Sequence, residues 1–136
     1  MSAQLAGHAI LVVEDEPLIA LDIAETFERA GACVIISHRL GDALGVIEAH
    51  DWSAAVLDYE LPDGDCSLLC EQLRTRGVPF VVHTGHAELP RASLGGIHVC
   101  KPASTDELVG ALEQLLKPFA KGRTVDLIGR DDTLGQ

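Results

Sequence analysis

Five side chains of this sequence have the chemistry and the spacing needed to form one reactive site. The carboxylates of Glu14 and Asp15 follow one apolar run, and the carboxylate of Asp58 follows another. Thr84 and Lys101 follow two further runs. Taken alone, each has an ordinary explanation, because an acid or a hydroxyl beside a strand often caps a helix or forms a turn. Their joint placement predicts a shared site.

The three carboxylates of this set predict a magnesium site. Carboxylates gathered in a small volume repel one another unless a cation neutralises them. Mg²⁺ prefers oxygen ligands, and it is commonly bound by one or two carboxylates together with phosphoryl oxygens and water. Asp58 is then predicted to act as a nucleophile toward phosphorus and to form an aspartyl phosphate. Lys101 would spread the charge of the phosphoryl oxygens, and the Thr84 hydroxyl would donate to one of them.

Five apolar runs are expected to be the strands that position these residues. The first run is continuous rather than alternating, which is typical of a strand buried on both faces of a parallel sheet. The runs comprise residues 9–13, 33–36, 54–57, 79–83 and 97–100.

Helical patterns separate these runs. Pro17 suits the first position of a helix, Ile19, Ile23 and Phe27 recur every four residues as its expected buried stripe, and Gly31 ends it.

A second helix is expected over about residues 41–50. After a turn at residues 61–64, a third helix is predicted to point Leu68, Leu69 and Leu73 inward and to stop near residue 77. The last helix is predicted from a capping box and three spaced leucines, which are Ser104, Glu107, Leu108, Leu112 and Leu115.

The alternation of strands and helices predicts an α/β fold with a doubly wound, five-stranded parallel sheet. In such sheets ligands bind beside the carboxyl ends of the strands, where the chemically capable residues stand. Residues 8–117 are expected to form one domain. The segment 86–96 contains one proline and two glycines, so its helix, the fourth, is predicted to be short or irregular.

The charge and composition of the chain argue against several classes of function. The formal net charge of −11 and the absence of a basic stripe argue against direct nucleic-acid binding. No apolar run is long enough to span a membrane, and the first residues do not resemble a signal peptide, so a cytoplasmic protein is expected. The four cysteines match no zinc spacing and are expected to be reduced thiols, with a zinc site or a redox pair as the alternative.

Four motifs of the chain resemble the receiver domain of bacterial two-component response regulators, across residues 8–117. They are residues 12–17 (Val-Val-Glu-Asp-Glu-Pro), residues 55–58 with 61–62, residues 84–85 and residues 101–102. The resemblance implies a flavodoxin-like receiver fold and Mg²⁺-dependent phosphoryl transfer from a histidine kinase or a phosphotransfer protein. It also implies that Asp58 is the phosphoacceptor and that Thr84 and Lys101 contact the phosphoryl group.

The resemblance also implies the metal ligands. Asp15 and Asp58 would bind Mg²⁺ directly, Glu14 mainly through water, and Glu60 through its backbone carbonyl. Residues 78–86 further resemble a subgroup of receivers with a Pro-Phe and Thr-Gly-Tyr signature on the fourth strand, although His86 stands where that subgroup has an aromatic residue.

A second departure concerns the switch residue. Most receivers carry Tyr or Phe three residues before the lysine, and this chain has His98 there. His98 is therefore a switch candidate, with an ordinary strand residue as the alternative. The stretch between Thr84 and Lys101 is also shorter than usual. The other histidines show no ligand spacing, although His83 and His86 are expected near the site.

The predicted function is a stand-alone response regulator that signals through an unidentified downstream protein or serves as a phosphate sink. Residues 118–136 do not continue the helical pattern and are expected to be a flexible tail, too short for a helix-turn-helix output domain. No enzymatic activity is expected beyond the chain's own phosphorylation and dephosphorylation, and a homodimer is left open.

Two alternatives remain. An aspartyl-phosphate phosphatase would place two aspartates, separated by one residue, after its first strand, whereas Asp58-Tyr59-Glu60 follows the third strand and lacks the second aspartate. A pseudo-receiver would bind partners without being phosphorylated, and the complete acid set argues against it.

Overall fold

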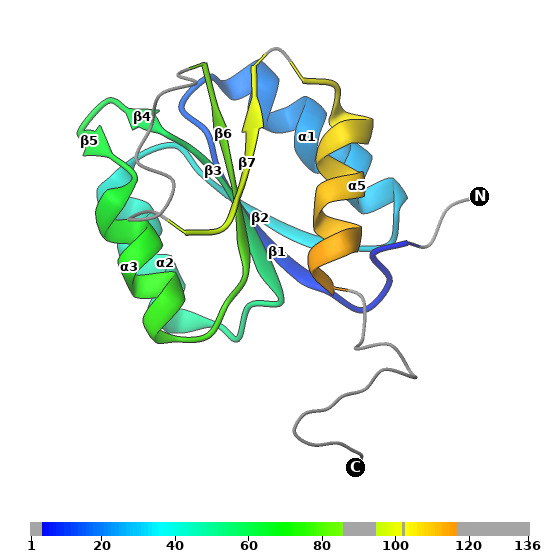
Figure 1. Cartoon of the computed structure of the whole chain (residues 1–136), viewed down its shortest axis with the longest axis horizontal. Coiled ribbons are helices and arrows are strands. Elements are labelled where there is room, and N and C mark those ends of the chain that lie inside the picture. The colour runs from blue at the N-terminus through cyan, green and yellow to red at the C-terminus, as the bar shows by residue number, and fades with distance from the viewer. Residues whose placement is uncertain (1–3, 86–94, 102, 117–136) are drawn as a thin grey trace.

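The computed structural model describes residues 4–85, 95–101 and 103–116. In these residues a parallel five-stranded sheet runs in the order β2-β1-β3-β6-β7, with helices on both faces (Figure 1). Its strands are β1 (Ala9–Val13), β2 (Cys33–Ser37), β3 (Ala54–Asp58), β6 (Phe80–Thr84) and β7 (Ile97–Cys100). The described helices are α1 (Pro17–Arg29), α2 (Leu40–Ala49), α3 (Ser67–Thr75) and α5 (Thr105–Leu116). The predicted doubly wound α/β fold is confirmed.

The strand order places a switch point beside β1. The chain passes from β1 to β2 on one side and then places β3 on the other side of β1. Crevices that bind ligands in open parallel sheets form where the strand order reverses in this way. Val13 and Leu57 are register partners, so the residues that follow β1 lie beside the end of β3.

Two apolar layers hold the sheet between the helices. Leu11 and Leu57 face the layer covered by α2 and α3, whereas Ile10 and Val56 face the layer covered by α1 and α5 (Figure 1). The central strands β1, β3 and β6 therefore supply alternate residues to opposite cores, as their continuous apolar runs predict, whereas β2 and β7 supply residues only to the core under α1 and α5. Burying one such aliphatic side chain contributes about 1.5–3 kcal/mol to folding.

Two of the predicted inward residues are exposed. Ile19 of α1 is 43% exposed, because it lines an open pocket between α1 and α5 instead of the core. Leu68 of α3 is 45% exposed, since a helix turns about 100° per residue and the buried stripe falls on Leu69, Cys70 and Leu73. Both predictions were wrong by one position on the helix surface.

The predicted helix starts are confirmed. Pro17 is the first residue of α1, and the Glu16 side chain caps that helix by accepting from the backbone N–H of Leu18. At the start of α5, the Ser104 hydroxyl accepts from the backbone N–H of Glu107 at 3.1 Å, and the Glu107 carboxylate accepts from the backbone N–H of Ser104 at 2.8 Å. These reciprocal bonds satisfy donors that a helix start leaves open.

The predicted turn at residues 61–64 is the tip of a small hairpin between β4 (Glu60–Leu61) and β5 (Gly64–Asp65). Its Asp63 carboxylate accepts from the backbone N–H groups of Leu40 at 2.8 Å and Gly41 at 3.0 Å. The hairpin is thereby bonded to the N-terminus of α2.

The structure has the four cysteines as free thiols. Cys66 and Cys70 are buried, and their Sγ atoms lie 3.7 Å apart. None of the helices in the described ranges is long and apolar enough to cross a bilayer. The predicted short fourth helix, His86 and the tail at 118–136 lie outside the described residues.

Candidate functional site

The sheet brings the predicted site residues to one edge. Asp58 is the last residue of β3 and Thr84 is the last residue of β6. Glu14 directly follows β1, and its backbone N–H extends the β1–β2 ladder by donating to Ser37 at 3.0 Å. Lys101 directly follows β7, and its backbone N–H donates to the Thr84 carbonyl at 2.7 Å. The backbone ladder therefore carries these residues to the same end of the sheet.

Three carboxylates converge there. Glu14, Asp15 and Asp58 each offer one oxygen atom, and these atoms all lie within 4.8 Å of one another. Glu14 and Asp58 are buried and Asp15 is exposed. This set offers only oxygen ligands and is open to solvent on one side. A hard divalent cation that keeps some of its water ligands requires such a site. The cluster fits Mg²⁺ binding.

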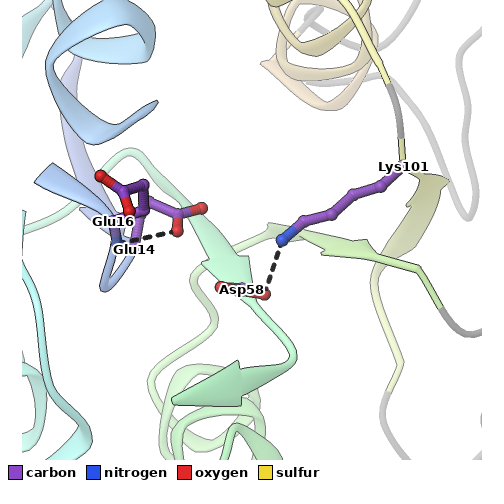
Figure 2. A network of polar contacts seen from close by, with 4 residues as sticks. All are labelled: Glu14, Glu16, Asp58 and Lys101. Carbon is purple, nitrogen blue, oxygen red and sulfur yellow. Dashed lines mark hydrogen bonds and ion pairs between the residues drawn. The ribbon is translucent and has the colours of Figure 1, made fainter. Parts of the chain in front are cut away.

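Lys101 supplies a cation to this cluster. Its Nζ donates to Oδ1 of Asp58 at 3.1 Å, and Figure 2 shows the side chain reaching Asp58 from the side opposite Glu14. The Asp58 side chain is largely buried and the Lys101 side chain is about one-third exposed. A hydrogen bond between two ionised groups is stronger than a neutral one, although solvent at Lys101 weakens it.

Burial changes the proton affinity of the two inner acids. Burial raises the pKa of Glu14 from 4.5 to about 7; the backbone N–H of Glu16, 3.1 Å from Oε2 of Glu14, opposes the rise, and the charge of Asp58 adds to it. Burial also raises the pKa of Asp58, and the hydrogen bond and charge of Lys101 limit that rise. Glu14 and Asp58 therefore hold protons more tightly than isolated acids do, until a cation takes the place of the protons.

The loop after Asp58 is fixed by backbone bonds. The Tyr59 N–H donates to the His83 carbonyl at 3.3 Å, and the Tyr59 carbonyl accepts from the Cys66 N–H at 2.9 Å. Glu60 then enters the β4–β5 hairpin, where it pairs with Asp65. This loop is therefore connected to β6 and to the start of α3.

The hydrogen bond described for His98 is not with the carboxylate cluster. It stands on β7, is half-buried, and has its Nε2 3.1 Å from the carbonyl of Gly95. Nothing in this contact decides whether His98 acts as a switch, so that role stays a prediction.

Several contacts of the site were not predicted from the sequence. The His38 Nδ1 lies 2.9 Å from the carbonyl of Glu14, and the Glu16 N–H bonds the Glu14 side chain. The sequence predicts Asp63 only as part of a turn. The pattern Asp-Gly indicates a turn but does not say which helix the carboxylate reaches.

Comparisons with known proteins agree with this geometry. The family model described as response regulator receiver domain matches residues 10–128. Transcriptional regulatory protein TcrA of Mycobacterium tuberculosis is 31% identical over 119 residues, which cover 82% of this chain and 47% of TcrA. Response regulator MprA of Mycobacterium avium is 28% identical over 135 residues, which cover 92% of this chain and 59% of MprA. The chain thus spans about half the length of these curated relatives.

Solved structures agree as well. A CheY-like receiver domain protein from Methanospirillum hungatei superposes with a TM-score of 0.75 at 27% identity, over 80% of this chain and 93% of that one. A response regulator receiver protein from Sinorhizobium medicae superposes with a TM-score of 0.74 at 28% identity, over 80% of this chain and 94% of that one.

Proposed function

Because this chain belongs to the family of response regulator receiver domains of two-component systems, we propose that it accepts a phosphoryl group on Asp58 from a histidine kinase or a phosphotransfer protein. One observation carries the proposal: the Asp58 carboxylate stands at the end of β3 within 4.8 Å of oxygens from Glu14 and Asp15 and 3.1 Å from the Lys101 ammonium. An acid in this position has a nucleophilic oxygen and a cation beside it to stabilise transferred charge.

The proposed metal ligands are Asp15, Asp58 and the backbone carbonyl of Glu60, with Glu14 acting mainly through water. Bound Mg²⁺ would neutralise the acidic cluster and stabilise the negative charge of the phosphoryl oxygens. The close approach of three carboxylate oxygens supports this assignment. Among the contacts of the described residues, Lys101 is a cationic hydrogen-bond partner of Asp58 only, so the charges of Glu14 and Asp15 are left for a metal ion to neutralise.

The chain's own residues would carry the transfer as follows. An Asp58 oxygen forms a bond to phosphorus while the phosphorus–nitrogen bond of the donor phosphohistidine breaks, and the electron pair stays on the imidazole nitrogen. The Lys101 Nζ, already at Oδ1 of Asp58, would bond a phosphoryl oxygen. The Thr84 hydroxyl would donate to another oxygen, and Gly85 leaves room for the group beside it.

Intact-protein mass spectrometry tests this function. Incubation with Mg²⁺ and either acetyl phosphate or phosphoramidate is expected to add the mass of one phosphoryl group. The adduct should be absent from Asp58→Asn and from samples with EDTA, and it should persist in Asp51→Asn, which changes an exposed aspartate outside the site. An adduct that survives Asp58→Asn, or no adduct with either donor and with a cognate kinase, contradicts the assignment.

The output is proposed to be protein contact. Receiver domains are signalling domains and not classical enzymes, and we infer that this chain acts in the cytoplasm through a downstream protein or as a phosphate sink. The net charge of −11 supports an output without direct DNA contact. We further propose that residues 8–117 form the receiver domain. Partner capture with and without phosphorylation tests this output.

A further inference from the structure

A pocket of about 430 Å³ lies between α1 and α5, next to the site already described. Figure 1 shows these two helices side by side on one face of the sheet. The walls are mainly aliphatic and include Leu18, Ile19, Ile23 and Leu108. A volume of this size with apolar walls and a few polar groups is typical of sites for small molecules.

One wall of the pocket contains a buried, unpaired histidine. His83 is 6% exposed, and neither of its ring nitrogens has a hydrogen-bond partner among the described residues. It is the register partner of Asp58 on the neighbouring strand, and it lines the pocket together with Lys101. A buried polar group without a hydrogen-bond partner destabilises the folded state, so native proteins seldom leave one without a use.

The state of this imidazole defines what it can bind. Burial and the nearby Lys101 charge together lower the pKa of His83 to about 4, and the charge of Glu107 opposes them. At neutral pH the ring therefore presents one N–H donor and one acceptor nitrogen. A hydroxyl group satisfies both kinds of atom, because it donates one hydrogen bond and accepts others. Turning the ring toward the pocket breaks no hydrogen bond to the described residues, since it makes none.

The wall of the pocket carries one charged side chain of each sign. Lys101 repels a cation and Asp22 repels an anion, so neither sign is favoured over a neutral ligand. We propose that the pocket between α1 and α5 is a binding site for a small neutral molecule with an apolar body and a hydroxyl group, which hydrogen-bonds His83. The proposal does not depend on phosphorylation of Asp58.

Binding of 2-naphthol to the full chain, without Mg²⁺ or phosphoryl donor, tests the site. Titration followed by ¹H–¹⁵N NMR is expected to show saturable shifts confined to α1, α5 and the end of β6. The variant His83→Leu should bind about tenfold more weakly, as expected for the loss of one hydrogen bond. His50→Leu, which changes an exposed histidine on the opposite helical layer, should bind like the wild type. The ether 2-methoxynaphthalene, which cannot donate, should also bind about tenfold more weakly.

Three results would overturn the proposal: no saturation up to the solubility limit, shifts that map elsewhere, or equal binding of the alcohol and the ether. The last would mean nonspecific apolar adsorption. Ala103→Leu, which narrows the pocket while retaining His83, provides a second variant if His83→Leu does not fold; unchanged affinity in Ala103→Leu would also contradict the site. Because no phosphorylation is involved, these failures are distinct from a failure of the phosphoacceptor assignment.

Discussion

The Lys101 ammonium reaches Oδ1 of Asp58 across an intervening strand. Asp58 ends β3 and Lys101 follows β7, and β6 lies between these two strands in the sheet. The Lys101 backbone is held to Thr84 at the end of β6, so its side chain crosses the edge of that strand to reach the acid. The ion pair therefore joins the outer strand to the centre of the site.

Removal of the Lys101 charge is expected to raise the pKa of Asp58 and of Glu14, because its charge lowers both. In Lys101→Met, NMR titration of the side-chain carboxyl carbons should show both pKa values above those of the wild type. The same variant should be phosphorylated by acetyl phosphate about 100-fold more slowly, the usual loss when one group that stabilises transferred charge is removed. Lys117→Met is the matched control. Unchanged pKa values would show that the Lys101–Asp58 contact is absent in solution.

The contribution of Glu14 to metal-free stability is expected to decrease as pH rises. The pKa of Glu14 is raised from 4.5 to about 7 in the folded chain, so the folded state binds a proton more tightly than the unfolded state between these values. The contribution of Glu14 to the free energy of unfolding should therefore fall from about pH 4.5 to about pH 7 and then level off. The lowered pKa of His83 acts in the opposite direction below about pH 6.5, so the comparison is between the wild type and Glu14→Gln, which share His83. Urea unfolding should show the wild-type free energy of unfolding decreasing relative to that of Glu14→Gln across this range, and a constant difference contradicts the burial of Glu14.

Magnesium is expected to reverse that trend. Because the metal requires ionised carboxylates, its affinity should increase as pH rises through about 7, where Glu14 loses its proton. The increase in unfolding midpoint on adding Mg²⁺ should then be larger at about pH 8 than at about pH 6. Asp58→Asn should lose most of the effect, whereas Asp51→Asn should keep it. A Mg²⁺ affinity independent of pH would exclude Glu14 from the site.

Asp63 is expected to stabilise the chain by bonding the start of α2. Hydrogen bonds from the backbone N–H groups of Gly41 and Leu40 lower the pKa of Asp63, so its contribution is present above the ordinary aspartate pKa and is lost as pH falls through the lowered value. Thermal unfolding of Asp63→Ala should occur at a lower temperature than that of the wild type near neutral pH. The difference should shrink in acid. Asp51→Ala is the control, and a constant difference at all pH values would mean that the charge is not involved.

Gly96 is expected to be intolerant of a side chain. Its φ is +74°, and a Cβ there would lie 2.6 Å from the Phe80 carbonyl oxygen. Gly96→Ala should therefore lower the free energy of unfolding by more than about 2 kcal/mol, through strain and a backbone clash. Gly110→Ala is the control, because Gly110 lies in α5 and an added methyl group there would meet nothing within 4 Å. This variant should be more stable than the wild type by up to about 1 kcal/mol. Equal stabilities in urea unfolding would contradict the close contact at Gly96.

The sequence was sufficient to predict the sheet and the convergence of the acids. The continuous runs at 9–13 and 97–100 coincide with β1 and β7, and the carboxyl-end rule brought Glu14, Asp15 and Asp58 together as predicted. These features depend on local apolar runs and on the order of elements, both of which can be read along the chain.

Features that depend on distant packing were not predictable. A spacing of four placed Ile19 inside, but whether α1 is covered there depends on how closely α5 approaches it. The reach of Asp63 to α2 and the unpaired nitrogens of His83 likewise depend on side chains from separate elements. Periodicity gives the face of a helix to within about one residue, and it does not identify the partner of a polar side chain.

The strand order also has a kinetic consequence. Each neighbouring pair in the main sheet is parallel and needs a crossover, so no two of these strands can pair as a local hairpin. Glu14 and Lys101 stand after the first and the last of these strands, and they meet around Asp58 only when the whole sheet has formed. A nascent or partly unfolded chain therefore has the acceptor residue but not the acceptor site. Phosphorylation of Asp58 would thus report complete folding of the molecule as well as the arrival of a signal.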